Sequence, residues 1–135
     1  GGAFTAIAEY VLEHDGIVFG VELQADYSVK HIAVESKAEL SKFRNSKYVQ
    51  SELGSTYAEV KQQLKTGRLV CFSGTPCQIE GLRYFLRRDY ENLVLVDVVC
   101  RAVPSPGVWK NVSMEQCNQS GLEIRHWDIS TLQWN

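Results

Sequence analysis

The amino-acid sequence predicts an α/β fold, with a largely parallel sheet flanked by helices and an N-terminal hairpin. In the second half of the chain, continuous apolar runs at 69–72 and 92–99 enclose a helical pattern, as expected of strands covered on both faces. In the first half, an amphipathic segment precedes two β-rich runs that a turn separates. The 135 residues are enough for one domain with a hydrophobic core.

The first half of the chain is expected to form a helix and a hairpin. Apolar residues recur on one helical face across residues 3–14, and Gly16 stops this pattern. The runs at 17–23 and 29–34 are rich in β-forming residues and flank a turn near Asp26. The two runs therefore predict an antiparallel pair of strands.

Capping boxes predict the next two helices. Residues 36–39 (SKAE) have the Ser-x-x-Glu spacing and precede a short helix that is expected to run to about Phe43. Residues 56–59 (TYAE) repeat this spacing at the start of a second helix, which Gly67 is expected to end.

The second half predicts alternating strands and helices. The buried strands are expected at 69–72 and 92–99, with a helix between them. A further helix is expected to begin at 105–106, and an alternating run at 122–129 predicts a last strand. This alternation is typical of a parallel sheet, and residues 1–135 are interpreted as a single α/β domain fragment.

Cys77 lies where the first buried strand gives way to a helix. Thr75 suits the N-cap, Pro76 suits the first helical position, and Gln78 completes a Thr-x-x-Gln capping box. The free N–H groups and the dipole of that helix favour negative charge on a thiol. Cys100 follows the second buried strand. If the two strands are parallel neighbours, both thiols lie at the same edge of the sheet, where open α/β sheets bind ligands.

The other cysteines and the histidines are interpreted as structural or surface residues. Cys71 lies inside an apolar run and Cys117 in a polar segment. Four cysteines placed in this way do not resemble a disulfide scaffold, so free or metal-bound thiols in a reducing, cytoplasmic setting are expected. His14, His31 and His126 lie in no motif with Cys77.

Composition excludes some classes of partner. The net charge is −2, which provides no electrostatic basis for binding nucleic acid or an anionic membrane. No apolar run approaches the roughly 20 residues that span a bilayer, and no leader sequence indicates secretion. The chain begins at Gly1 without a methionine, which favours a piece of a longer protein.

Six segments, taken in order, carry a family resemblance. They are GGAFTAIAEYVLE (1–13), GIVFGVEL (16–23), VKHIAVES (29–36), RNSKYVQS (44–51), GTPCQIEGLR (74–83) and VDVVCRAVPSPGVW (96–109). Together they resemble the β subunit of coenzyme F420 hydrogenase/dehydrogenase, including its bacterial relatives. The resemblance implies the central part of an oxidoreductase subunit that holds FAD and a 4Fe-4S cluster. Such a subunit passes electrons between the cluster and a hydride carrier or redox partner.

The resemblance also implies the cluster ligands. Two ligands match Cys77 and Cys100, and the other two are expected from a Cys-x-x-Cys pair outside this chain, which contains none. The family commonly shows His-Gly after the second of these cysteines, where this chain has Arg101 and Ala102. The implied partners are a ferredoxin-like protein, a hydrogenase or dehydrogenase subunit, or a small hydride carrier, and whether F420 is used stays open.

A FAD site in three segments is implied in the same way. The glycines that open the first helix leave N–H groups free for a pyrophosphate, and the polar segment at 44–51 brings a lysine near a phosphate or the flavin. Small residues before Cys77 let backbone amides approach the cofactor, and Gln78 either serves only as a cap or also faces the flavin. The residues implied for FAD are Gly1, Gly2, Ala3, Ser46, Lys47, Tyr48, Gly74, Thr75 and Gln78.

Two alternatives of other classes stay open. The first is a non-catalytic or degenerate module that retains the fold without its cofactors, for which the Arg101-Ala102 departure leaves room. The second is a thiol enzyme with Cys77 as nucleophile, which lacks an evident partner histidine.

Overall fold

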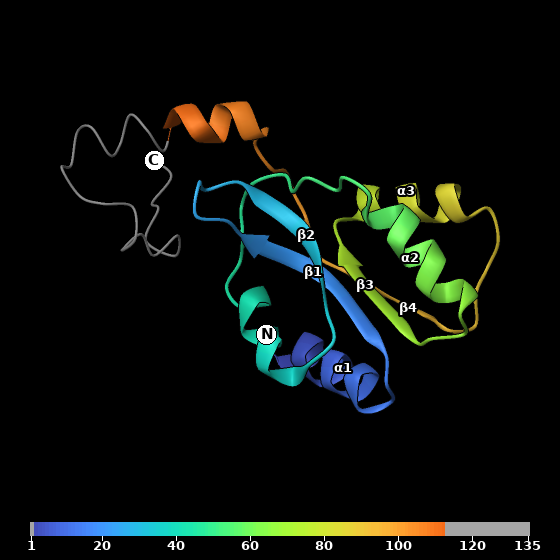
Figure 1. Cartoon of the computed structure of the whole chain (residues 1–135). Helices are drawn as coiled ribbons and strands as arrows, with labels where there is room; N and C mark the ends of the chain where they lie inside the picture. Colours follow the sequence, from blue (N-terminus) through green and yellow to red (C-terminus); the bar gives the residue numbers. More distant parts are fainter. Residues whose placement is uncertain (1, 113–135) are drawn as a thin grey trace.

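The structure is a computed structural model that describes residues 2–112 (Figure 1). Residues 106–112 are helical, and none of the described helices is long and apolar enough to cross a membrane. The expected strand at 122–129, together with Gly1, Cys117 and His126, lies outside the described residues. The elements are α1 (Gly2–Glu13), β1 (Ile17–Leu23), β2 (Val29–Val34), the 3-10 helix η1 (Lys37–Phe43), α2 (Thr56–Lys65), β3 (Val70–Gly74), α3 (Pro76–Leu86) and β4 (Leu93–Asp97).

The four strands form one sheet in the order β2-β1-β3-β4. β1 and β2 are antiparallel, with Val18 opposite Val34, which confirms the predicted hairpin. β1 pairs with β3 in parallel, and β3 pairs with β4 in parallel. The predicted α/β fold with a largely parallel sheet is therefore confirmed.

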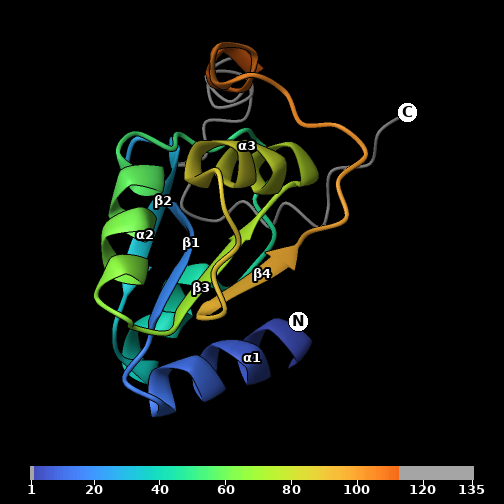
Figure 2. The same ribbon diagram turned by 90° about the vertical axis from the view of Figure 1, so that its right-hand side faces the viewer.

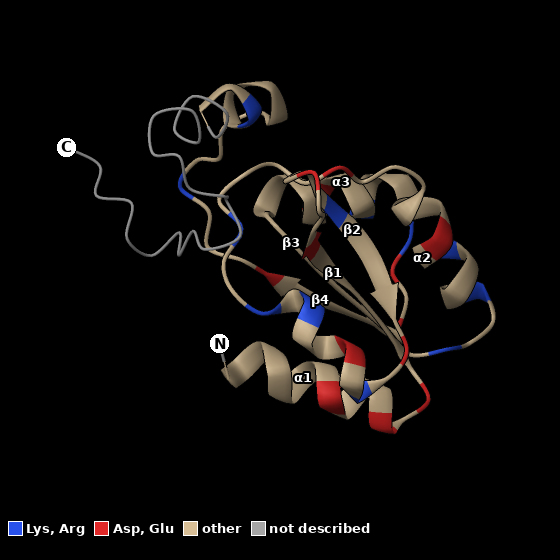
Figure 3. Ribbon diagram, turned by 60° about the vertical axis from the view of Figure 1, so that its left-hand side comes forward, with Lys and Arg blue, Asp and Glu red and all other residues tan. Residues whose placement is uncertain are grey.

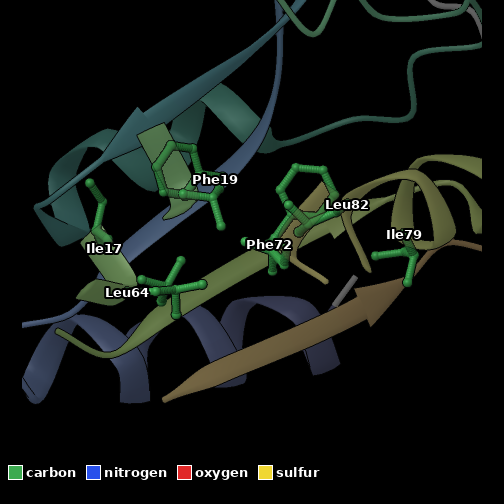
Figure 4. Packing of buried hydrophobic residues seen from close by; sticks show 9 residues of the cluster. Ile17, Phe19, Leu64, Phe72, Ile79 and Leu82 are labelled. Atoms are coloured by element: carbon green, nitrogen blue, oxygen red, sulfur yellow. The ribbon is translucent and has the colours of Figure 1, made fainter. Parts of the chain in front are cut away.

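Helices cover both faces of the sheet (Figure 2). Because successive residues of a strand point to opposite faces, Cys71 and Phe72 of β3 enter two different apolar layers. The Cys71 layer packs α1 and η1 against the sheet, and its buried members are Ala8, Val11, Val18, Val34, Leu40 and Cys71. The Phe72 layer packs α2 and α3 against the other face (Figure 4), and its buried members are Ile17, Phe19, Val60, Leu64, Val70, Phe72, Ile79, Leu82 and Leu86.

The predicted capping box at Ser36 is wrong. Its hydroxyl donates to the Glu39 carboxylate at 3.1 Å and forms no bond to the backbone. The Glu39 N–H already donates to the Ser36 carbonyl at 3.2 Å, as the tighter turn of a 3-10 helix requires. The short helix therefore forms where it was expected, with different local hydrogen bonding.

The predicted capping box at Thr56 is also wrong, because α2 begins one residue earlier than a box with Thr56 as the N-cap requires. Ser55 occupies the N-cap position of α2, and its hydroxyl bonds to the Glu59 carboxylate. Thr56 is the first helical residue, and its side chain is buried. A side chain turned into the protein in this way is not available to cap the helix.

The predicted strand boundaries need small corrections. The run expected at 69–72 forms Val70–Gly74, and the run expected at 92–99 forms Leu93–Asp97. The backbone stays paired one step beyond β4, since the Val98 N–H donates to the Gly74 carbonyl at 2.9 Å. The expected stop after α2 is confirmed at Gly67, which has a φ of 82°.

Candidate functional site

The parallel strands β1, β3 and β4 end at one side of the sheet, which we call the carboxyl edge. The last backbone bond between β3 and β4 joins Val98 to Gly74. Cys77 lies three residues after Gly74, and Cys100 lies two residues after Val98. The predicted parallel pairing is confirmed, and adjacent strands deliver the two cysteine-bearing loops to the carboxyl edge. A shared site for the two sulfur atoms stays a prediction.

Cys77 lies exposed in the first turn of α3. The Gln78 side chain accepts a bond from the Thr75 N–H at 3.1 Å, which confirms the predicted capping role of Gln78. The Thr75 hydroxyl lies 3.1 Å from the Cys77 sulfur atom. Exposure and a helix N-terminus are the surroundings in which a thiolate can act as a ligand.

The other described cysteines have contrasting surroundings. Cys100 is half-buried, whereas Cys71 is fully buried in the layer beneath α1. Burial raises the pKa of the Cys71 thiol to about 12, so this thiol is neutral at ordinary pH. Its interpretation as a structural residue is confirmed. All three are free thiols in the part of the chain that the structure describes.

The chain after Cys100 crosses the carboxyl edge towards β2 (Figure 1). The Gln50 N–H donates to the Pro104 carbonyl at 3.2 Å, so this crossing loop contacts residues 49–52, which we call the bridging segment. The bridging segment follows the outer side of β2, because the Glu52 N–H donates to the Val29 carbonyl at 2.8 Å. It therefore joins two parts of the molecule that are far apart in sequence.

A buried polar network lies beneath the carboxyl edge. His31 Nε2 lies 3.0 Å from the Ser73 carbonyl, and His31 Nδ1 lies 2.9 Å from the Ser51 hydroxyl. The Gln78 amide donates to the same hydroxyl at 2.9 Å, and its oxygen accepts from the Thr75 N–H. The network thus runs from the carbonyl of Ser73 to the amide of Thr75 through three side chains.

The hydrogen-bond partners determine the direction of each bond in this network. The Ser73 carbonyl can only accept, so His31 Nε2 carries a proton, and in the neutral ring Nδ1 accepts from the Ser51 hydroxyl. The Ser51 oxygen accepts in turn from the Gln78 amide nitrogen. Burial lowers the pKa of His31, which favours the neutral imidazole. His31 is 7% exposed and stacks on Phe72, with ring centroids 5.1 Å apart.

Sequence reasoning did not identify this network. It interpreted His31 as a structural or surface residue, and it considered Ser51 only as the end of a polar segment. One signal was available, because His31 and Val29 occupy alternate, buried positions of β2, where an apolar residue is the usual choice. The partners of His31 lie 20 and 42 residues away, which no local pattern reveals.

Two of the segments implied for FAD lie close together. α1 leads through a tight turn into β1, so its N-terminus, with the exposed Gly2 and Ala3, points towards the carboxyl edge (Figure 2). The Phe4 ring lies 6.1 Å from the Phe43 ring at the end of η1. The start of α1 is therefore beside the segment that contains residues 46–48. Gly1 lies outside the described residues.

The ammonium group of Lys47 is held by backbone carbonyls that are close to it in sequence. It donates to the carbonyls of Lys42 and Arg44 at 3.2 and 2.6 Å, near the C-terminal end of η1. Burial lowers the pKa of Lys47. Ser46 and Tyr48, on either side of it, are exposed. Basic and acidic residues are interspersed along the helices and loops of the ribbon (Figure 3).

Gly74 and Gln78 have roles inside the protein. A Cβ atom at Gly74 would lie 3.0 Å from the Phe72 ring and 3.1 Å from the Gln78 oxygen, so packing alone favours glycine there. Both polar atoms of the Gln78 amide are bonded within the chain. By contrast, a Cβ atom at Gly2 would meet nothing within 4 Å. The open positions among the implied residues are thus Gly2, Ala3, Ser46 and Tyr48, with Thr75 half-buried.

The donor set at the carboxyl edge suits part of an iron–sulfur site. A 4Fe-4S cluster takes four thiolates, and Cys77 and Cys100 are two thiols on adjacent loops of one edge. Within residues 2–112, no three His, Cys, Asp or Glu side chains are grouped so that they could hold a metal ion. The chemistry of the two thiols therefore fits a cluster that takes its remaining ligands from elsewhere.

Comparisons with known proteins place the chain in a family. Residues 67–135 match a family model for the C terminus of the coenzyme F420 hydrogenase/dehydrogenase beta subunit. A chain of the F420-reducing NiFe hydrogenase complex from Methanosarcina barkeri has a similar fold, with a TM-score of 0.67 and 22% sequence identity. The similarity covers 89% of this chain and 44% of that chain, so this chain spans less than half of that relative. No curated protein sequence gave a match.

Proposed function

This chain belongs to the coenzyme F420 hydrogenase/dehydrogenase β-subunit family, and on that premise we propose that it is part of an electron-transfer subunit that holds FAD and a 4Fe-4S cluster. The single observation that carries the proposal is the parallel pairing of β3 and β4. This pairing delivers the loops of Cys77 and Cys100 to one edge of the sheet. The N-terminus of α1, which carries the first residues implied for FAD, points towards the same edge (Figure 2).

Cys77 and Cys100 would hold the cluster, which transfers one electron at a time when bound. The chain contributes the surroundings of the two thiolates. The N-terminus of α3 favours negative charge at Cys77, and the Thr75 hydroxyl, 3.1 Å from the sulfur atom, is placed to donate to a thiolate. Arg101, directly after Cys100, adds a fixed positive charge near the second ligand.

FAD would bind at the start of α1 and along residues 46–48, and it couples two-electron hydride transfer to single-electron steps when bound. The N-terminus of α1, with Gly2 and Ala3, suits its pyrophosphate, and Gly1 is included in the proposed site as the residue that precedes Gly2 in sequence. Ser46 and Tyr48 offer exposed hydroxyl groups beside that helix end. Lys47 supplies a positive charge whose position η1 fixes.

The complete protein would exchange electrons with a redox partner. We propose a ferredoxin-like protein, a hydrogenase or dehydrogenase subunit, or a small hydride carrier. The structural relative is part of a hydrogenase complex, which supports a protein partner of this kind. The free thiols of the described residues suit a reducing setting such as the cytoplasm.

Anaerobic reconstitution of the intact subunit with iron and sulfide tests the cluster. We expect a brown protein with four iron atoms per chain, and complete loss of that colour in Cys77→Ala and in Cys100→Ala. Cys117→Ala is the matched control and should keep the cluster. A colourless wild-type protein would contradict the proposal and favour the module without cofactors. Loss in only one of the two variants would contradict the shared site.

Cross-linking tests the shared edge in this chain without any cofactor. Dibromobimane becomes fluorescent when its two arms alkylate neighbouring thiols. We expect fluorescence in the wild-type chain, and none in Cys77→Ser or Cys100→Ser, whereas Cys117→Ser should retain it. A wild-type chain alkylated at both Cys77 and Cys100 without fluorescence would show that the two thiols lie apart.

A further inference from the structure

The bridging segment is bonded both to the first turn of α3, which carries Cys77, and to the loop that follows Cys100. Ser51 accepts from the amide of Gln78, the residue directly after Cys77, at 2.9 Å. The neighbouring Gln50 donates its N–H to the Pro104 carbonyl at 3.2 Å, in the loop that follows Cys100. Two adjacent residues of one segment therefore hold the start of α3, which follows β3, and the loop that follows β4.

The buried network is bonded to the backbone on both sides of the junction between β3 and α3. It bonds the carbonyl of Ser73 at one end and the N–H of Thr75 at the other. These groups flank Gly74, which has no side chain of its own to restrict it. The backbone that leads to Cys77 is thus restrained on both sides of its glycine.

Each donor in the network has one acceptor. The Thr75 amide, the Gln78 amide nitrogen, the Ser51 hydroxyl and His31 Nε2 donate in series towards the Ser73 carbonyl. His31, Ser51 and Gln78 are buried, so water does not readily replace a missing partner. Loss of the Ser51 hydroxyl would therefore leave His31 Nδ1 and the Gln78 amide nitrogen without the partner that they share.

We propose that His31, Ser51 and Gln78 are positioning residues, which fix the start of α3 with Cys77 and the loop of Cys100 at the carboxyl edge through the bridging segment. The inference rests on the proposed function only in treating those cysteines as ligands. None of the three needs to contact the cluster. They act by holding the backbone of Thr75 directly, and that of Pro104 through Gln50.

Ser51→Ala tests the proposal in the full chain without cofactors. Site-resolved hydrogen exchange should show at least about tenfold weaker protection of the Thr75 amide, because Gln78 loses the partner that holds its side chain. Protection of the Gln50 amide should also weaken. Protection of the Leu82 amide, in the middle of α3, is the control and should not change. The rate of Cys77 alkylation, measured by peptide mass spectrometry, should also change in a variant that loses protection of the Thr75 amide.

Conservative variants separate positioning from general stability. Ser51→Thr keeps the hydroxyl and should restore both the Thr75 protection and the Cys77 alkylation rate. His31→Phe keeps a ring on Phe72 but removes both hydrogen bonds, and it should resemble Ser51→Ala. Unchanged Thr75 protection in Ser51→Ala would overturn the proposal, and so would an equal loss at Leu82.

The ring of His31 provides a readout that needs no variant. Nitrogen NMR of the wild-type chain near neutral pH should show a neutral imidazole with the proton on Nε2. A ring with its single proton on Nδ1 could not donate to the Ser73 carbonyl and would overturn the proposal. All these measurements are made without a cluster, so failure of cluster assembly contradicts the proposed function and leaves the positioning result unaffected.

Discussion

His31 links the charge state of one side chain to the stability of the fold. Its neutral ring donates to the Ser73 carbonyl and accepts from the Ser51 hydroxyl. A second ring proton would place a charge in this buried site and would require the Ser51 hydroxyl to turn its own proton away from Nδ1. Burial also lowers the pKa of His31, so the folded chain binds this proton less readily than the unfolded chain does.

Acid should therefore destabilise the protein through His31. The unfolded state binds more protons than the folded state below pH about 6.5, the ordinary value for histidine, so the free energy of unfolding falls as the pH drops below it. The slope has a limit of about 1.4 kcal/mol per pH unit. Urea unfolding between pH 5 and 7.5 measures this pH dependence of the free energy of unfolding. His31→Phe should lose the part of it that His31 contributes. Parallel pH profiles for the two proteins would contradict the prediction.

Cys71 and Cys77 should differ in both reactivity and structural importance. Iodoacetamide should modify the exposed Cys77 in the native chain and leave Cys71 untouched, because Cys71 is buried and its pKa is about 12. Cys71→Ser buries a hydroxyl and should cost about 1–3 kcal/mol of unfolding free energy, measured in urea. Cys77→Ser is the matched control, with an expected change within about 0.5 kcal/mol. Equal losses in the two variants would contradict this assignment.

The turn between α1 and β1 depends on a close backbone approach. The Gly16 N–H donates to the Val11 carbonyl at 2.9 Å, and the next N–H, from Ile17, donates to the Leu69 carbonyl. A Cβ atom at Gly16 would lie 2.5 Å from the Val11 oxygen and 2.7 Å from the Leu69 oxygen. The Val11 carbonyl cannot move without losing the bond that closes the turn after α1, and the Leu69 carbonyl cannot move without losing its bond to the first residue of β1.

Gly16→Ala should consequently destabilise the chain by at least about 1–3 kcal/mol, the usual cost of overpacking. Gly107→Ala is the matched control, since its added methyl group meets nothing within 4 Å and alanine favours a helix. That variant should be neutral or slightly stabilised. Thermal unfolding of both variants provides the comparison, and similar unfolding temperatures would count against the close approach.

The sheet separates two apolar layers. Val11 of α1 is fully buried in one layer, and Val60 of α2 is fully buried in the other. Side chains on opposite faces of a sheet share few neighbours, so their contributions to stability are expected to be independent.

Val11→Ala and Val60→Ala should therefore have additive effects on the free energy of unfolding. The double variant should match the summed single losses within about 0.5 kcal/mol. Val60→Ala combined with Val70→Ala is the comparison pair, because both residues belong to the layer around Phe72. Urea unfolding of all five variants measures the terms. A cross-sheet coupling larger than the coupling within one layer would contradict the separation.

Short-range patterns predicted the elements because helices and turns depend on neighbours in sequence. Gly67 stops α2 and Thr75 begins α3 as expected, since a left-handed backbone and an N-cap are local requirements. The boxes at Ser36 and Thr56 were misjudged because burial and the tighter 3-10 turn changed which groups were free to bond. For the candidate site, the same reasoning predicted the transition from strand to helix near Cys77 and the cap that Gln78 forms.

By itself, the sequence determined the order and type of the elements, the position of Cys77 in a first helical turn and a family resemblance that the comparison of residues 67–135 supports. Only the tertiary structure decided the strand order β2-β1-β3-β4, the crossing of the Cys100 loop to Gln50, and the bonding of His31 to Ser51. The physical reason is the range of the interactions. Capping and periodicity act over a few residues, whereas buried polar partners meet only after packing has chosen which strands and loops are neighbours.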